Sequence, residues 1–178
     1  MNDHASVGAR HAVPLQARLE ADYRQSEPDA QISDFAAISD GWETEVYSFA
    51  LTRPDRAERL ILRMYPGTNA AAKCVHEYQA LQSLSRAGYP VPAVYRCETD
   101  AALLGKPFLI MQQINGRSLG AIMREDAARQ PELLSRFVGL LVDLHRLNGF
   151  EAQLSQRRWR EWIIGQLGQT WALPVLDW

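Results

Sequence analysis

An alternation of apolar and polar side chains over residues 59–66 predicts a strand with two unlike faces. One face would carry Leu60, Leu62 and Met64, and the other would carry Ile61, Arg63 and Tyr65. Arg63 is therefore a cation in the middle of an otherwise apolar strand. Pro66 and Gly67 follow directly, and this pair is typical of a turn that ends a strand.

The next segment, residues 70–87, has the period of an amphipathic helix. One stripe of this helix would hold Cys74, Tyr78, Leu81 and Leu84, and Glu77 lies inside that stripe. A carboxylate on a buried helix face is costly unless a cation or several donors accompany it. Because Arg63 is the nearest cation that points away from a strand, we expect Arg63 and Glu77 to form an ion pair.

Similar patterns predict the other elements before residue 115. Residues 1–12 lack periodicity and are expected to be disordered, and Pro14 is expected to open a short helix. Strands are predicted at residues 32–38, 45–51, 59–65, 92–97 and 108–114. The short connections between the first three strands predict an antiparallel meander. The helix between the third and fourth strands is expected to end at Gly88, in the C′ position.

Beyond residue 114 every periodic segment is helical. Helices are predicted at residues 119–128, 131–147 and 155–168, and residues 171–178 are expected to form an irregular end. The helix at 131–147 has little polar surface and is expected to be buried. The sequence thus divides into a disordered start with an N-terminal helix over residues 1–30, a sheet domain over 31–114 and a helical part over 115–178.

The composition narrows the class of protein. The 19 Lys and Arg residues nearly balance the 21 Asp and Glu residues, which argues against a nucleic-acid partner or a membrane surface. No apolar run approaches the roughly 20 residues that span a bilayer. Cys74 and Cys97 imply no disulfide framework, so a cytoplasmic location is expected. The four histidines are scattered and no CxxC motif occurs, so no metal site is predicted.

The order of these elements, with a single-glycine loop before the second strand, resembles the small lobe of a kinase-like fold. The motifs are most similar to those of the aminoglycoside phosphotransferase and choline kinase family: GWETEVY at 41–47, LILR at 60–63, HEYQAL at 76–81, GYPVP at 88–92 and PFLIM at 107–111. The resemblance covers residues 32–147. It implies an α+β fold with a protein-kinase-like small lobe of five antiparallel strands and one helix, followed by a hinge and the first helices of a truncated large lobe.

The small lobe of that family binds ATP, and the resemblance extends this role to residues of this chain. Gly41 and Thr44 would lie in the loop over the phosphates, where backbone amides can bind an anion. Arg63 would contact the α- and β-phosphates and would be held by Glu77. The structural alternatives are a plain hairpin glycine at position 41 and an ion pair without a ligand.

The resemblance also implies a hinge that binds adenine. The backbone of Gln112 and Ile114 would hold the base, and Met111 would lie behind its ring. The alternative is a buried edge strand with no ligand. Tyr65, like Trp42 and Tyr47, is interpreted as a core or wall residue.

The catalytic and magnesium-binding loops of that family would follow the end of this sequence. The aspartates after Gly116 are Asp126, Asp143 and Asp177, and none lies in a His-Gly-Asp type of motif, so no catalytic residue and no metal ligand is assigned. The intact enzyme would use ATP with magnesium to phosphorylate a hydroxyl of a small molecule. The last twenty residues carry Trp159, Trp162, Trp171 and Trp178. The chain is therefore expected to be an inactive fragment that forms homo-oligomers through an apolar helical end.

Three interpretations remain open at this point. The first is the nucleotide-binding lobe of a small-molecule phosphotransferase, and the second is a non-catalytic kinase-like module for binding or dimerisation. The third, a plain α+β scaffold without nucleotide, leaves the placement of Arg63 and Glu77 unexplained. Coding sequence beyond Trp178 with a His-x-Asp and an Asp-x-Asp motif would separate the first from the second. Binding of Mg-ATP would separate the second from the third.

Overall fold

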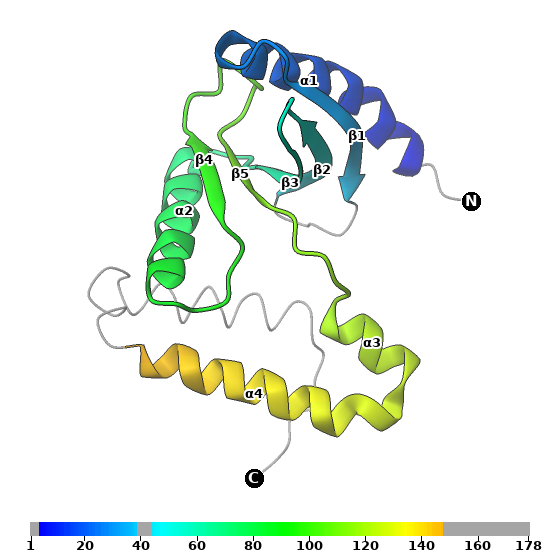
Figure 1. Cartoon of the computed structure of the whole chain (residues 1–178), viewed down its shortest axis with the longest axis vertical. Coiled ribbons are helices and arrows are strands. Elements are labelled where there is room, and N and C mark those ends of the chain that lie inside the picture. Colours follow the sequence, from blue (N-terminus) through cyan, green and yellow to red (C-terminus); the bar gives the residue numbers. More distant parts are fainter. Residues whose placement is uncertain (1–3, 39–43, 148–178) are drawn as a thin grey trace. The chain divides into compact units, whose positions relative to one another are not determined.

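The computed structural model of the chain describes residues 4–38 and 44–147 (Figure 1). The elements are α1 (His4–Ser26), β1 (Gln31–Ile38), β2 (Glu45–Thr52), β3 (Ala57–Met64), α2 (Ala70–Arg86), β4 (Val94–Glu98), β5 (Phe108–Gln112), α3 (Leu119–Glu125), the 3-10 helix η1 (Ala127–Arg129) and α4 (Gln130–Arg146). They belong to two compact units, which comprise residues 1–116 and 117–178.

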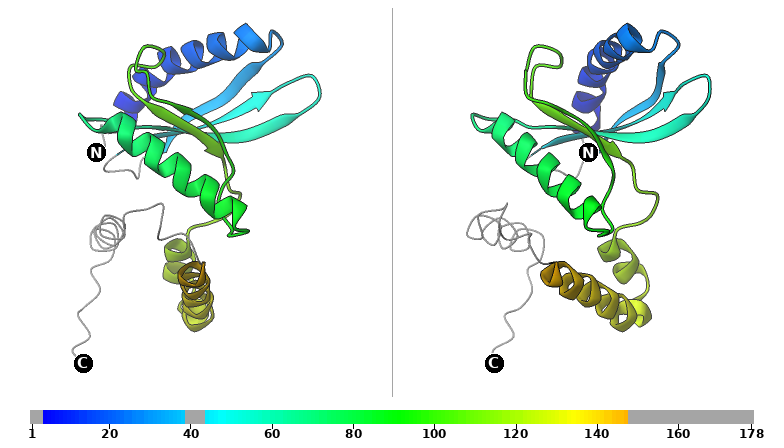
Figure 2. Two further views of the ribbon diagram at one scale, coloured as in Figure 1. Left: turned by 90° about the vertical axis from the view of Figure 1, so that its left-hand side faces the viewer. Right: turned by 60° about the vertical axis from the view of Figure 1, so that its left-hand side comes forward.

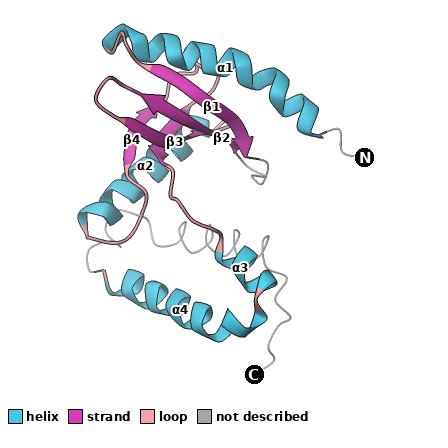
Figure 3. Cartoon of the chain, turned by 45° about the vertical axis from the view of Figure 1, so that its right-hand side comes forward, coloured by secondary structure: helices cyan, strands magenta, loops and turns pink. Residues whose placement is uncertain are grey.

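The first unit is built on one five-stranded antiparallel sheet in the order β1-β2-β3-β5-β4, whose strands are drawn in magenta in Figure 3. Strands β1 to β3 form the meander that their short connections predict. β3 then lies in the centre of the sheet, between β2 and β5, and α2 connects it to the edge strand β4. Arg63 pairs in register with Val46 on one side and Leu109 on the other. The predicted sheet with one helix between its third and fourth strands is therefore confirmed.

Side chains that alternate along β3 and β5 separate two apolar clusters on the two sheet faces. The first cluster unites Leu60, Leu62, Met64, Phe108 and Ile110 with Leu19 of α1. The second unites Leu109 and Met111 with Cys74 of α2, and Ile61 packs against it. The helices α1 and α2 accordingly cover opposite faces of the sheet (Figure 2). Because Arg63 shares its strand face with Ile61, its side chain leaves the sheet on the α2 face.

Two glycines with positive φ set the ends of the α2 segment. Gly67 has φ 88° in the turn before the helix, and Gly88 has φ 75° directly after the cap residue Ala87. The amide of Tyr89 donates to the carbonyl of Leu84 at 3.0 Å, and the amide of Gly88 donates to Ser85 at 3.0 Å. A glycine adopts this left-handed conformation without the steric cost of a Cβ. The prediction that Gly88 occupies the C′ position is confirmed.

The start of the chain differs from the prediction. The helix α1 begins at His4 and not at Pro14, so the expectation of disorder through residue 12 was wrong for residues 4–12. The amphipathic pattern covers the later part of α1, where Leu19 is fully buried and Tyr23 packs beside it. Residues 4–12 carry no comparable period, and for this reason the pattern did not reveal their helix.

The second unit contains α3, η1 and α4. Ser118 caps α3, because its Oγ accepts from the amide of Ala121, and Asp126 caps η1 in the same way through Ala128. The prediction that α4 is buried was wrong. Of its apolar residues, Leu133 is buried, whereas the exposed ones are Leu134, Phe137, Val138, Leu140 and Val142. The helix predicted at 155–168 and the irregular end at 171–178 lie outside the described residues.

Candidate functional site

The ion pair predicted between β3 and α2 is present. Arg63 Nη1 lies 3.0 Å from Glu77 Oε1. The Arg63 side chain is 33% exposed and the Glu77 side chain is 23% exposed. Both groups thus keep contact with solvent while they are held on the α2 face of the sheet. At this distance the two opposite charges attract each other directly, which holds the guanidinium against α2.

Tyr65 is the second partner of Glu77, and it was not assigned to the site from the sequence. Its hydroxyl donates to Glu77 Oε2 at 2.8 Å. Burial, with the nearby charge of Glu77, raises the pKa of Tyr65 well above its ordinary value, so the hydroxyl keeps its proton. The two carboxylate oxygens of Glu77 are therefore divided between Arg63 and Tyr65. The signal that could have identified Tyr65 is its position two residues after Arg63, on the same strand face.

The guanidinium of Arg63 is incompletely satisfied. Its Nε is the one buried side-chain nitrogen or oxygen without a hydrogen-bond partner among residues 15–38 and 44–147. A buried donor without a partner costs about 1–3 kcal/mol. Native structures contain few such groups, and each of them requires an explanation. The contact with Glu77 involves one of the three guanidinium nitrogens, so it does not by itself use all five N–H donors of Arg63.

The predicted hinge, residues 111–114, lies at the end of β5, the strand next to β3 in the sheet. Met111 is buried in the cluster that also contains Tyr65 and Cys74. The backbone amide of Gln112 donates to Ala93 O at 2.8 Å, so only its carbonyl oxygen could accept from a ligand. Ile114, two residues after the end of β5, is 60% exposed. The structure therefore brings Met111 near the β3–α2 face, with the backbone of Gln112 and Ile114 beyond it.

The predicted phosphate loop is only partly within the described residues. Gly41 lies outside them. Thr44 directly precedes β2 and is half-buried, and the register Glu45–Met64 places it beside the end of β3 that carries Arg63. Glu45 forms an ion pair with Lys106. Its position alternates with Val46, the cross-strand neighbour of Arg63, so Glu45 lies on the opposite sheet face.

Comparison with known proteins assigns the chain to a family. A family model described as the phosphotransferase enzyme family (APH) matches residues 34–174. The chain belongs to this family. A crystal structure from Ralstonia eutropha, provisionally described as that of an aminoglycoside phosphotransferase, matches with 25% identity and a TM-score of 0.42 over 57% of this chain and 28% of that chain. The chain thus spans less than a third of that protein's length. No curated protein matches the chain significantly.

Family membership agrees with the arrangement of the first unit. The five-stranded sheet, with a helix between β3 and β4 that carries Glu77, is the kinase-like small lobe expected for a phosphotransferase. Within residues 4–38 and 44–147 no three His, Cys, Asp or Glu side chains lie close enough together to hold a metal ion. In the same part of the chain, no helix combines the length and the apolar character that a membrane crossing needs.

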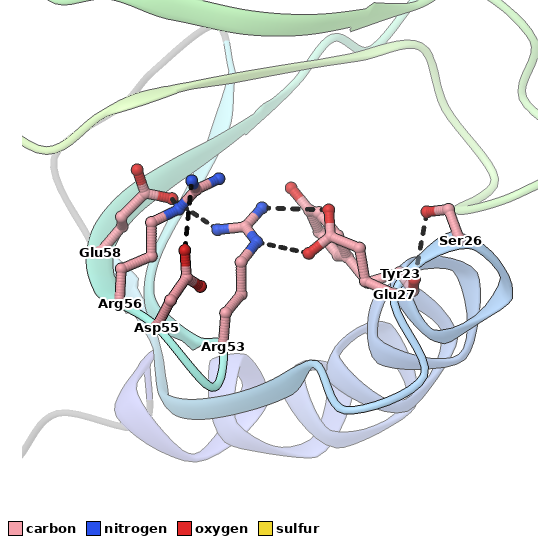
Figure 4. Close-up of polar contacts among 7 residues, drawn as sticks. All are labelled: Tyr23, Ser26, Glu27, Arg53, Asp55, Arg56 and Glu58. Carbon is pink, nitrogen blue, oxygen red and sulfur yellow. Dashed lines mark hydrogen bonds and ion pairs between the residues drawn. The ribbon is translucent and has the colours of Figure 1, made fainter.

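A second charged cluster lies at the turn between β2 and β3 and consists of Glu27, Arg53, Arg56 and Glu58 (Figure 4). Arg53 donates to Glu27 at the end of α1 through Nε and Nη2, and to Glu58 Oε2 through Nη1 at 2.6 Å. Arg56 lies 3.7 Å from the same Glu58 oxygen. These residues adjoin a depression of about 320 Å³, but every guanidinium nitrogen of Arg53 already has a carboxylate partner. The cluster therefore connects α1 to the sheet, and each guanidinium nitrogen of Arg53 is engaged by a carboxylate of the protein itself.

Proposed function

We propose that the first unit binds ATP and is the nucleotide-binding lobe of a small-molecule phosphotransferase. The observation that carries the proposal is Arg63: it projects from the central strand, is held by a carboxylate on α2, and keeps a third of its side chain exposed. The ion pair engages one terminal guanidinium nitrogen, Nη1, and the exposed part of the side chain stays accessible to a ligand. A guanidinium held in this way suits a polyphosphate, because its planar donors match phosphate oxygens.

The proposed roles follow the positions of the described residues. Arg63 binds and orients the α- and β-phosphates, and Glu77 fixes the direction of the guanidinium. The carbonyl of Gln112 and the amide of Ile114 hold the base, with Met111 at its inner edge. Thr44, before β2, belongs to the loop over the phosphates, and Gly41, which lies outside the described residues, is assigned to the same loop from the sequence alone. ATP supplies the γ-phosphoryl group that the intact enzyme would transfer to a hydroxyl of its acceptor.

Magnesium is not assigned to any of the described residues, because they contain no cluster of side chains that could hold a metal ion. Asp126, one of the few aspartates after the hinge, already caps η1 through a bond to the amide of Ala128 at 3.1 Å. We therefore assign no residue to the metal and no catalytic residue. This assignment keeps a second candidate function open, in which the chain binds nucleotide without turnover as a kinase-like binding or dimerisation module.

The test is the binding of ATP by the 178-residue chain, measured by titration calorimetry with and without magnesium. Replacing Arg63 by alanine removes charge-assisted bonds worth about 1.5–3 kcal/mol, so we expect binding to weaken about tenfold to a hundredfold. Arg56→Ala is the matched control, since it removes the same charge at the far end of β3. Equal affinities of wild type and Arg63→Ala would refute the phosphate role. Binding without any phosphate transfer to small alcohols would favour the non-catalytic module.

The predicted self-association and the cytoplasmic location stay predictions. The tryptophans of residues 155–178 lie outside the described residues. The exposed apolar side chains of α4 support the proposal that this unit meets a partner surface, because such patches are disfavoured in water. Sedimentation velocity over a range of protein concentrations tests it, and a sedimentation coefficient that stays at the monomer value would contradict it.

A further inference from the structure

Two cysteines that the nucleotide site does not use lie in direct contact. Cys74 Sγ on α2 and Cys97 Sγ on β4 are 3.2 Å apart. Cys74 is fully buried, and Cys97 is partly exposed at the edge of the same apolar cluster. In the ribbon views α2 and β4 run side by side, which agrees with their packing (Figures 1 and 2). Both cysteines are free thiols.

The surrounding structure holds the two sulfur atoms in this contact. Cys74 is anchored on the second cluster with Leu109 and Met111, and its sulfur also lies 3.1 Å from Phe108 O. Cys97 pairs in register with Leu109 of β5. A disulfide requires the sulfurs to approach to about 2.05 Å, so each has to move by about half an ångström. Rotation of the two side chains about their Cα–Cβ bonds moves the sulfur atoms relative to each other.

We propose that Cys74 and Cys97 form a reversible intramolecular disulfide when the protein meets hydrogen peroxide. In the first step the thiolate of Cys97 attacks one peroxide oxygen, the O–O bond breaks, and Cys97 becomes a sulfenic acid while hydroxide leaves. In the second step Cys74 Sγ attacks Cys97 Sγ, the S–O bond breaks, and hydroxide leaves again. The hydroxides take up the two thiol protons. The balance is two thiols and one peroxide giving one disulfide and two waters, with two electrons passed to the peroxide.

The order of the two steps follows from the environments of the thiols. Burial and the hydrogen bond with Cys97 raise the pKa of the Cys74 thiol well above its ordinary value. Cys74 is also fully buried, whereas part of Cys97 reaches solvent. Peroxide therefore reacts first at Cys97, and Cys74 serves as the resolving thiol. Because the first thiol is held against an apolar cluster, we expect the reaction to be slow and to require peroxide in excess.

The bridge would act on the helix that carries Glu77. Cys74 precedes Glu77 by three residues, so the two side chains occupy neighbouring turns of one face of α2. The disulfide would close a chain segment with a sequence separation of 23 residues, and it would fasten this part of α2 to the edge strand β4. A crosslink of this kind restricts the unfolded chain and opposes local opening. The oxidised protein should therefore unfold at a higher temperature than the reduced protein.

The experiment treats the reduced 178-residue chain with hydrogen peroxide, quenches it by alkylation and analyses it by intact-mass and peptide mass spectrometry. The proposal expects the loss of two hydrogen atoms, a crosslinked peptide pair containing Cys74 and Cys97, a raised midpoint of thermal unfolding, and reversal of all three by dithiothreitol. Cys97→Ser is the matched control, because it changes the partly exposed sulfur only and should show neither the crosslink nor the shift in midpoint.

Three outcomes would overturn the proposal. One is the addition of two oxygen atoms at Cys97 while Cys74 is alkylated normally, which would mean that Cys74 does not resolve the sulfenic acid. Another is a disulfide between two chains, seen as a dimer in non-reducing electrophoresis. The last is a wild-type protein that keeps both thiols after peroxide has oxidised a free cysteine added to the same sample. These measurements do not involve nucleotide, so their result is independent of the proposed ATP site.

Discussion

Arg53 and Arg63 are each held by carboxylates, yet the surroundings of the two side chains differ. At the turn between β2 and β3, Arg53 is 14% exposed and gives all three of its nitrogens to Glu27 and Glu58 (Figure 4). On the central strand, Arg63 is 33% exposed, shares one nitrogen with Glu77 and leaves Nε without a partner. Arg53 thus has a carboxylate at every guanidinium nitrogen, whereas the ion pair of Arg63 engages one nitrogen of a more exposed side chain.

The comparison teaches that the presence of an ion pair does not identify a binding site. Structural networks and active sites both place charges in contact. What distinguishes them here is the number of donors that the protein itself satisfies and the place of the residue in the fold. Arg53 joins a helix end to a hairpin turn, whereas Arg63 lies on the central strand, opposite Leu109 of β5. Substitutions at the two arginines should therefore affect different measurements.

Among the variants that compare the two arginines, the largest effect is expected from removing the charge of Glu77, the carboxylate that holds Arg63. Glu77→Gln keeps the size of the side chain but loses its attraction for Arg63, and we expect ATP affinity to fall about tenfold. Glu58→Gln makes the same change beside Arg53 and should leave ATP affinity unchanged. Calorimetric titration of both variants is the measurement. A similar loss of affinity in the two variants would show that the effect arises from general destabilisation.

The next largest effect concerns stability at the other arginine. Arg53→Ala removes the partner of two carboxylates at once and disconnects the end of α1 from the sheet. Because Glu27 and Glu58 remain partly hydrated, we expect the free energy of unfolding to fall by only about 1–2 kcal/mol. Urea denaturation monitored by circular dichroism measures this change. Arg56→Ala, which removes a more exposed cation from the same turn, should cost less than about 0.5 kcal/mol.

A smaller effect is expected from the hydroxyl that shares Glu77. Tyr65→Phe removes the donor to Glu77 Oε2 and keeps the buried ring in place. The loss of one hydrogen bond to a partly exposed carboxylate should lower the free energy of unfolding by about 1 kcal/mol. ATP affinity should fall less than in Glu77→Gln, since Arg63 keeps its ion pair. Tyr47→Phe is the control, because Tyr47 belongs to the cluster on the opposite sheet face.

The sequence predicted the sheet and the pair of Arg63 and Glu77 because both depend on local periodicity. An alternation over eight residues places Arg63 on the α2 face, and a helical stripe places Glu77 opposite to it. The role of Tyr65 was missed because a tyrosine on a strand packs apolar atoms in most cases, and its hydroxyl partner depends on tertiary structure. The Arg53 cluster was missed for the same reason, since Glu27 lies 26 residues away along the chain.

The exposure of α4 could not have been predicted from its residues alone. Its composition is that of a buried helix, and periodicity identifies an apolar face without naming what covers it. The described neighbours α3 and η1 are short and bury only Leu133 among the residues of α4. Burial is therefore a property of the assembled unit, whereas helix formation is largely a property of the segment.

The smallest effect that still distinguishes the two arginines is the pH dependence of stability. The hydrogen bond from Arg53 lowers the pKa of Glu27 from its ordinary value of 4.5. Since the folded-state pKa is the lower one, the stabilisation is fully present above pH 4.5 and is lost as pH falls through the folded-state value. The difference in unfolding free energy between wild type and Arg53→Ala should accordingly shrink in acid. Glu27→Gln removes the titrating group. The difference in unfolding free energy between Glu27→Gln and the double variant Glu27→Gln/Arg53→Ala should therefore vary less with pH. If the difference in the Glu27→Gln background varies with pH as strongly as the difference between wild type and Arg53→Ala, then a carboxylate other than Glu27 is responsible. The assignment of the pH effect to the pair of Arg53 and Glu27 would then be incorrect.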